Sequence, residues 1–164
     1  MKNIIQPIAV TMGDPSGIGI EVTLRAWKNR KIKHPFFLIH DYSYVKKIIK
    51  KMKINIPLKL ISEPNQAVKT YKNFLPIYQL EVAKNTQLGK PNKQNAKVIL
   101  KSIDMALNFI QLGEAAAMVT NPIAKNIINY ASKNFTGHTE YLAKKSKSKN
   151  FCMMLINDTI RVIP

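Results

Sequence analysis

Continuous apolar runs alternate along this chain with segments whose apolar residues recur at helical spacing. Short apolar runs are typical of strands buried in a parallel sheet. They predict strands at residues 7–11, 35–40, 57–61 and 115–120, and two final strands at 151–156 and 159–163 around a turn at 157–158. We expect the runs at 7–11, 35–40 and 115–120 to be buried.

Helical segments fill the intervals between these runs. We expect a helix over residues 18–29 and a second one capped by Asp41 that runs through Met52. A long helix should start at Asn92 or Asn95 and end at Gly113, the usual residue type after a helix C-terminus. Its apolar positions are Ala96, Ile99, Leu100, Ile103, Leu107 and Ile110.

Two further helices are expected in the last third of the chain. Asn121 should cap one that Pro122 opens, since proline is favoured at the first helical position. Another should begin at His138. Residues 62–91 are predicted to be irregular, with a strand near 77–80.

Strands that alternate with helices indicate an α/β fold built on a layered, partly parallel sheet. Open sheets of this kind bind ligands at the carboxyl ends of their strands. The loops at residues 13–19, 120–125 and 135–139 follow such strand ends or lie near them, so they are the candidate binding loops.

The net charge of +17 raises the question of a nucleic-acid partner. The basic residues, however, are 23 lysines and only 3 arginines. Recognition of phosphates and bases depends strongly on the bidentate arginine fork. Abundant lysine, asparagine and isoleucine also fit drift in an AT-rich genome, so we predict no nucleic-acid partner, although a basic nucleic-acid-binding protein remains the alternative from another class.

Cysteine content and hydropathy indicate a compartment. Cys152 is the only cysteine and lies in an apolar run, which predicts a buried, inert thiol. Gln6 and Pro7 interrupt any signal-like apolar core, and no run approaches the roughly 18 residues of a membrane span. We therefore expect a cytoplasmic protein with no membrane partner.

His138 and Thr139 stand where a glycine-containing turn meets an amphipathic segment. The start of a helix offers free N–H groups and a partial positive charge, which together attract anions. The two residues are therefore candidates for a phosphate or carboxylate pocket. In the alternative interpretation, Thr136 or Thr139 only caps the helix and His138 is exposed.

The loop at residues 13–19 joins a strand to a helix and contains Gly17 and Gly19, which could let the backbone approach an anion. Its glycine spacing does not match the dinucleotide-binding pattern, and it lacks the lysine of a P-loop. The alternative is a tight turn with Asp14 as cap and Pro15 as the first helical residue.

The loop at residues 120–125 contains Asn121 and Lys125. A lysine in the first helical turn is unfavourable unless it serves an anion or a nearby carboxylate. Lys125 is therefore a candidate anion contact, with a snorkelling surface lysine as the alternative.

Three ordered blocks carry a family resemblance: residues 11–19 (TMGDPSGIG) with Glu21, residues 119–125 (VTNPIAK), and residues 135–143 (FTGHTEYLA). Residues 153–155 and 161–162 continue the match. Together they resemble the 4-hydroxythreonine-4-phosphate dehydrogenase family of pyridoxal phosphate biosynthesis.

The resemblance implies a two-domain, three-layer α/β/α subunit like the isocitrate and isopropylmalate dehydrogenases, acting as a homodimer. It implies oxidation of 4-phosphohydroxy-L-threonine at C3 with NAD or NADP, then decarboxylation to 3-amino-2-oxopropyl phosphate, aided by a divalent metal (Zn, Mg, Mn or Co). His138 and Thr139 match the substrate-binding pair. Accessory anion or cofactor contacts would come from Asp14, Gly17, Gly19, Asn121 and Lys125.

The chain departs from the family in length, since members are about twice as long and their metal-binding histidines match positions beyond Pro164. We therefore expect a truncated subunit, with residues 1–131 as the first part of a discontinuous domain and 132–164 as the start of the second. Such a chain should bind no metal and be inactive alone. Dehydrogenases of D-threonate or D-erythronate 4-phosphate share these motifs, so they remain an alternative, as does a decayed gene product.

Overall fold

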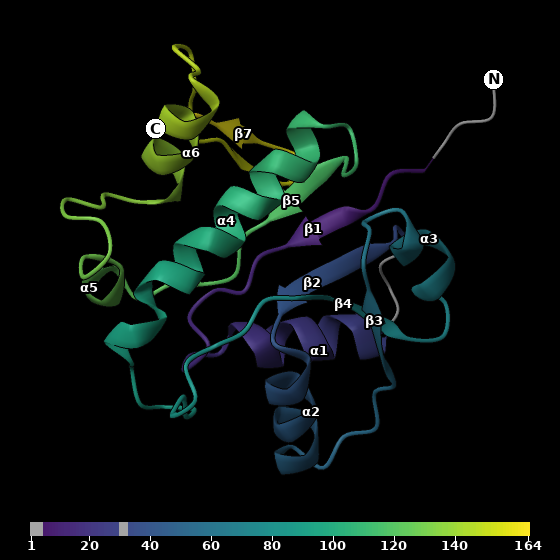
Figure 1. Cartoon of the computed structure of the whole chain (residues 1–164). Coiled ribbons are helices and arrows are strands. Elements are labelled where there is room, and N and C mark those ends of the chain that lie inside the picture. Colours follow the sequence, from purple (N-terminus) through teal and green to yellow (C-terminus); the bar gives the residue numbers. More distant parts are fainter. Residues whose placement is uncertain (1–4, 30–32) are drawn as a thin grey trace.

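A parallel five-stranded sheet forms the centre of the computed structural model, which describes residues 5–29 and 33–164 (Figure 1). The strand order is β3-β4-β2-β1-β5. The strands are β1 (Ile8–Val10), β2 (Phe36–His40), β3 (Leu58–Ile61), β4 (Leu75–Gln79) and β5 (Ala117–Val119). A separate antiparallel pair joins β6 (Leu155–Ile156) to β7 (Arg161–Val162).

Helices connect the strands and cover the sheet. They are α1 (Gly19–Asn29), α2 (Tyr42–Lys51), α3 (Gln66–Thr70), α4 (Ala96–Gln111), α5 (Lys125–Ile128) and α6 (His138–Ser146), with a 3-10 turn, η1 (Lys93–Asn95), before α4. No helix in the described part of the chain is long and apolar enough to cross a membrane.

Alternating side chains of the strands build two separate cores, which gives the three layers. Val10 and Leu38 pack with Leu24 of α1 and Val45 of α2 on one face. On the other face, Ala9, Phe37 and Ile39 pack with Ala67 of α3 and Phe109 of α4. Figure 1 shows α4 on one side of the sheet and α1 with α2 on the other. The predicted α/β/α class is therefore confirmed.

Two predicted helix boundaries are confirmed by their capping geometry. The Asp41 carboxylate accepts a hydrogen bond from the Tyr44 amide at 3.0 Å and caps α2. Gly113 follows α4 with a φ of +72°, a left-handed conformation that glycine adopts without steric cost.

The helix expected to open at Pro122 begins instead at Lys125, so that prediction was wrong. The cause is tertiary: the Asn121 side chain bonds to Thr11 and Thr23 rather than capping a helix, and the Pro122 carbonyl accepts from the Asp14 amide. The region at 62–91 also holds α3, which the sequence did not indicate, and β4 starts two residues earlier than the strand predicted near 77–80.

Two predictions of burial were wrong. β5 was expected to be buried, yet Val119 is 52% exposed because β5 is the outermost strand of the sheet. Cys152 was expected to be buried and is exposed, because residues 151–164 do not pack into any of the described cores. In these two segments, an apolar run therefore predicted a strand but did not predict burial in the core.

Candidate functional site

Asn121 joins the two loops that follow β1 and β5. Its backbone N–H donates to Thr11 Oγ1 at 3.1 Å, and its side-chain amide donates to the Thr11 carbonyl and to Thr23 Oγ1, each at 2.9 Å. The residue is 5% exposed. Its amide N–H groups are thus used within the protein, which makes Asn121 a clamp between loops rather than a donor to a ligand.

Gly13 and Gly19 are the points at which the first loop meets this clamp. A β-carbon on Gly13 would lie 2.6 Å from Asn121 Cβ and 2.8 Å from the Pro122 carbonyl oxygen, and one on Gly19 would lie 2.9 Å from Asn121 Cβ. The predicted close approach at Gly19 is therefore to the neighbouring loop. Gly17 is partly exposed, and a β-carbon on it would lie near Asp14 only. Its backbone is therefore more open than the backbone of Gly13 or Gly19.

Asp14 is 6% exposed and shapes the loop from within. Its carboxylate accepts from the Ser16 amide at 2.8 Å, and its own amide donates to the Pro122 carbonyl. The Tyr44 hydroxyl donates to the Pro15 carbonyl at 3.0 Å. Burial and, second, the Asp14 charge raise the pKa of Tyr44 to about 12, so the phenol keeps its proton. Asp14 therefore forms a tight turn, as the alternative interpretation predicted, but the helix part of that interpretation was wrong: α1 begins at Gly19, so Asp14 does not cap it and Pro15 lies in the turn.

His40, at the carboxyl end of β2, is a buried polar residue that the sequence did not single out. Its Nδ1 accepts from the Asp41 amide at 2.8 Å, so the ring proton is on Nε2, which has no partner among the described residues. The ring stacks on Tyr44 at a centroid distance of 5.7 Å. Burial lowers the pKa of His40 to about 4, so it is neutral at physiological pH. The sequence placed this histidine in the run at 35–40 that was predicted to be buried, directly before a helix cap, and gave no other signal for it.

His138 is the first residue of α6, and the structure does not support its alternative interpretation as an exposed residue. The N-cap is Gly137, so no side chain caps the first turn. His138 is half-buried, with its ring edge toward Phe135 at a centroid distance of 6.5 Å. Its Nε2 is buried and has no hydrogen-bond partner among the described residues.

The environment of His138 keeps it neutral. Burial lowers its pKa below the usual 6.5. The first-turn amides of α6 carry the positive end of the helix dipole and have no side-chain cap. A neutral imidazole with an unused nitrogen beside free N–H groups can accept a proton when an anion arrives, so this helix start is suited to bind a phosphate or carboxylate.

Thr139 is half-buried on the same turn of α6, so the predicted pair is held together. Lys125 is the first residue of the four-residue helix α5 and is exposed, with no ion pair among the described residues. That position fits the snorkelling alternative for Lys125.

The three predicted loops form a continuous structure. Hydrogen bonds join residues 11–19 to Asn121 and Pro122, and an apolar cluster joins Ile123 and Ala124 to Phe135 and Tyr141. No hydrogen bond links His138 directly to the glycine loop within the described ranges. The loops are thus brought to one edge, although the side chains of Asp14, Asn121, His138 and Lys125 do not converge on one point.

A cofactor site in these loops would need metal ligands or an open glycine cradle. The described residues contain no group of three or more His, Cys, Asp or Glu side chains that could hold a metal ion. The Glu21 carboxylate pairs with Arg25 at 2.8 Å, and Gly13 and Gly19 are covered by Asn121. Neither a complete metal site nor an open dinucleotide cradle is therefore present in these loops.

The fold and these loops define an α/β/α protein whose polar groups gather at the carboxyl edge of a parallel sheet. Solved structures share this fold. That of 4-hydroxythreonine-4-phosphate dehydrogenase from Klebsiella pneumoniae matches with a TM-score of 0.85 at 23% identity, over 96% of this chain and 50% of that one. The enzyme of the same name from Burkholderia phymatum matches with a TM-score of 0.84 at 22% identity, over 97% of this chain and 49% of that one.

Sequence comparison gives the family. A family model described as "Pyridoxal phosphate biosynthetic protein PdxA" matches residues 31–164, and the chain belongs to this family. The 4-hydroxythreonine-4-phosphate dehydrogenase of Zymomonas mobilis is 32% identical over 98% of this chain, and that of Methylorubrum extorquens is 34% identical over 97%. The resemblance drawn from the sequence blocks is therefore confirmed.

The chain spans about half the length of these curated relatives, 48% in both cases. The boundaries expected for two domains, at residues 131 and 132, stay a prediction.

Proposed function

We propose that this chain forms the part of an NAD(P)- and metal-dependent dehydrogenase that holds an anionic group of 4-phosphohydroxy-L-threonine. In the proposed reaction, the C3 hydroxyl would lose its proton and a bound NAD or NADP would accept the hydride from C3. The resulting 3-oxo acid would then lose its carboxylate as carbon dioxide, and C2 would take up a proton to give 3-amino-2-oxopropyl phosphate. The proposal rests on family membership and on the relatives' names.

One observation supports the substrate role: His138 is half-buried at a helix start without a side-chain cap, and its Nε2 has no partner within residues 5–29 and 33–164. An oxyanion at this position would accept from the free amides of the first turn of α6. It would also favour a protonated imidazole, since an opposite charge within about 4–6 Å raises the pKa of a histidine. His138 would therefore bind the anion as a charged donor, and the half-buried Thr139 would add a hydroxyl.

The metal and most cofactor contacts would belong to the part of the relatives that this chain does not match. We propose that the working enzyme is a cytoplasmic homodimer that includes both parts, and that the chain alone has no turnover. This proposed division rests on the chain matching about half the length of its relatives.

Binding of the substrate to this chain can be measured directly. In a titration followed by NMR, 4-phosphohydroxy-L-threonine should shift the imidazole signals of His138 and raise the pKa of this residue. The exposed His34, whose Nε2 lies 2.8 Å from the Gln6 carbonyl oxygen, is the internal control and should not change. Equal shifts at both histidines, or none at His138, would contradict the substrate role.

Activity is tested by the formation of NADH or NADPH, measured by absorbance, with substrate and a divalent metal present. The chain alone should give no turnover, and addition of the unmatched half of the Zymomonas mobilis enzyme as a second polypeptide should give a measurable rate. D-Threonate and D-erythronate 4-phosphate are compared in the same assay, and a higher kcat/KM for either would replace the proposed substrate. Clear turnover by the chain alone would refute the proposed division of the site.

A further inference from the structure

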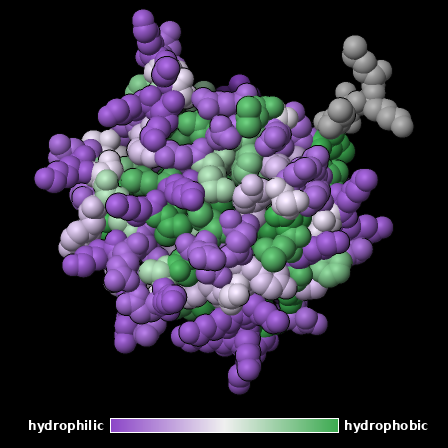
Figure 2. Space-filling view, viewed as in Figure 1, coloured by the Kyte–Doolittle hydropathy of each residue, from purple (hydrophilic) through white to green (hydrophobic). Residues whose placement is uncertain are grey.

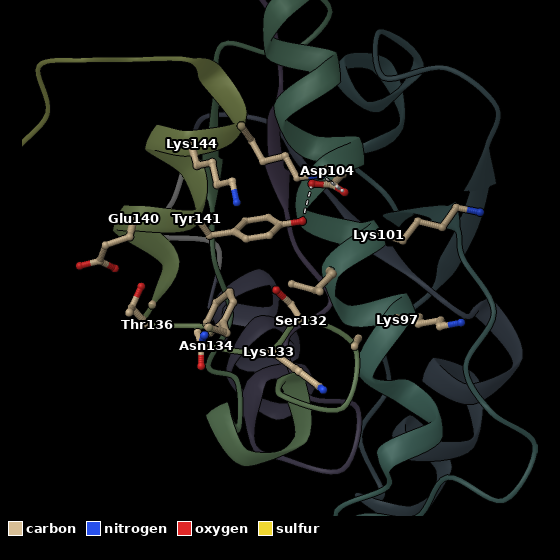
Figure 3. Close-up of a pocket in the computed structure, with 15 residues that line it drawn as sticks. Lys97, Lys101, Asp104, Ser132, Lys133, Asn134, Thr136, Glu140, Tyr141 and Lys144 are labelled. Atoms are coloured by element: carbon tan, nitrogen blue, oxygen red, sulfur yellow. Dashed lines mark hydrogen bonds and ion pairs between the residues drawn. The ribbon is translucent and has the colours of Figure 1, made fainter.

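A cavity of about 510 Å³ lies between α4, α6 and the segment at residues 131–137 (Figure 3). Its volume is within the range of small-molecule sites in proteins. Thr136, Gly137 and Glu140 line it, but His138 and Thr139 do not, although they belong to the same segment. The cavity is therefore lined by residues other than the pair His138 and Thr139 on which the proposed substrate role rests.

A partly exposed network of Tyr141, Asp104 and Lys145 lines one side of this cavity. The Tyr141 hydroxyl donates to Asp104 Oδ1 at 2.8 Å, and Lys145 Nζ lies 3.0 Å from Asp104 Oδ2. Burial, with the hydrogen bond to Asp104 as the second cause, raises the pKa of Tyr141 to about 12, so its hydroxyl remains a donor. The Asp104 carboxylate is thus partnered by Tyr141 and Lys145 of α6, which partly offsets its charge toward the cavity.

The remaining lysines of the lining have no such partner in the described part of the chain. These are Lys97 and Lys101 on α4, Lys133 on the connecting segment and Lys144 on α6. None of them forms an ion pair among the described residues. Figure 3 shows Lys144 beside the Tyr141 ring, whereas Lys97 and Lys101 extend from α4 away from Tyr141, and Glu140 also points away from Tyr141.

Helix stability does not explain the two lysines of α4. Lys97 lies in the first turn, which holds no acidic residue, and a cation is unfavourable at this end of the helix dipole. Lys97 and Lys101 are also four residues apart, a spacing at which like charges repel each other. An anion between α4 and α6 would relieve both effects.

A second lysine-rich cavity, beside α2, provides a contrast. Its described lining includes Lys47, Lys50, Lys51, Lys53 and Lys90 and no carboxylate. Lys50 and Lys51 lie in the last turn of α2, where the helix dipole favours cations. The helix itself therefore accounts for part of this second cluster.

We propose that the cavity between α4 and α6 binds a small phosphorylated anion with two or more negative charges. The four lysines come from three separate segments that line the cavity, and their flexible stems would have to turn inward for a compact anion to contact several of them together. Lysine stems are flexible, and each ammonium group offers three donors, which suits the oxygens of a phosphate. The Phe135 and Tyr141 rings, 5.6 Å apart, add an apolar wall on which an organic part could pack.

Lysine acetylation followed by mass spectrometry tests this proposal on the intact chain, with pyrophosphate as the probe at constant ionic strength. When the free pyrophosphate concentration is about twice its Kd, about one third of the chains have an unoccupied site. Acetylation of Lys97, Lys101, Lys133 and Lys144 should therefore slow by about threefold. The lysines of the cavity beside α2 should react at unchanged rates. Equal protection of both clusters, no protection at all, or protection by a single-stranded oligonucleotide but not by pyrophosphate would overturn the proposal.

Two charge-matched variants give a second measurement. The first combines Lys97→Ala, Lys101→Ala and Lys133→Ala, and the second combines Lys47→Ala, Lys50→Ala and Lys51→Ala, so each lowers the net charge from +17 to +14 (17 − 3). By calorimetry, the first should bind pyrophosphate about tenfold more weakly, and the second should match the parent, because screened charges outside the cavity contribute little. The proposed site would be refuted if both variants lost the same affinity for pyrophosphate, or if neither lost any. His138→Ala should leave pyrophosphate protection of the cavity intact, which separates a failure of this site from a failure of the substrate role.

Discussion

Two histidines of this chain are held neutral by burial but differ in what surrounds them. His40 is fully buried, with Nδ1 bonded to the Asp41 amide and its ring stacked on Tyr44. His138 is half-buried at an uncapped helix start, where an arriving anion can favour the charged ring. Burial keeps both rings neutral, but their surroundings differ. His40 therefore has a structural role, whereas His138 is a candidate ligand contact.

His40 should make the stability of the chain depend on pH. Its folded-state pKa of about 4 lies below the ordinary 6.5, so the unfolded chain takes up the proton first as the pH falls. The stabilisation by neutral His40 is complete above about pH 6.5, and about 2 kcal/mol of it should be lost between pH 7 and pH 5. Urea unfolding at the two pH values measures this loss.

The variant His40→Gln, which keeps an acceptor group, should be less stable at neutral pH and should lack this part of the pH dependence. His34→Gln is the matched control, because His34 is exposed. The assignment to His40 is wrong if both variants retain the same pH dependence as the parent.

At the level of elements, the loops after β1 and β5 act as one unit because Asn121 fills the space beside Gly13 and Gly19. This contact joins residues more than a hundred positions apart, so no local pattern could show it. The glycines of the segment at 11–19 were visible in the sequence. Two of them are required because Asn121 of the other loop occupies the space that a β-carbon would need.

Gly13→Ala should lower the free energy of unfolding by about 3 kcal/mol, from left-handed backbone strain together with overpacking against Asn121. Gly89→Ala is the control: Gly89 also has a positive φ, +77°, but nothing lies within 4 Å of a β-carbon there. It should cost only about 1 kcal/mol, the strain alone. If urea unfolding shows the same loss of unfolding free energy for both variants, the contact with Asn121 does not contribute to the cost of Gly13→Ala.

The elements themselves were largely predictable. Apolar runs gave the positions of β1 and β2, and Asp41 and Gly113 marked helix ends because local bonds and backbone angles decide them. The start of α5 and the exposure of β5 were not predictable, since tertiary bonds of Asn121 and the order of strands in the sheet decide them. Among the site residues, the pair His138 and Thr139 was singled out from its position, whereas His40 was predicted only as part of the buried run at 35–40, because its bond to the Asp41 amide and its stacking on Tyr44 depend on the folded structure.

At the scale of the whole molecule, the surface combines strong positive charge with exposed apolar side chains. Figure 2 shows hydrophilic side chains over most of the viewed face, with hydrophobic patches between them. The largest run of exposed apolar residues is at 151–163, where Met154 is 46% and Ile156 is 64% exposed. Unpaired sheet edges and exposed apolar patches favour association between chains.

We expect this chain to self-associate as its concentration rises, and the paired changes Met154→Lys and Ile156→Lys should weaken that association. Sedimentation velocity at several concentrations measures it. Ile18→Lys is the control, because Ile18 is 65% exposed but lies in the loop before α1. Association that is the same in all three proteins would place the contact elsewhere.

The exposure of Cys152 has a practical consequence. It is the sole thiol of the sequence, and it precedes β6 in the same apolar run. A maleimide dye would therefore attach at one known position without any engineered substitution. The colour and polarisation of its emission would then report, in real time, whether another polypeptide comes to cover that end of the chain.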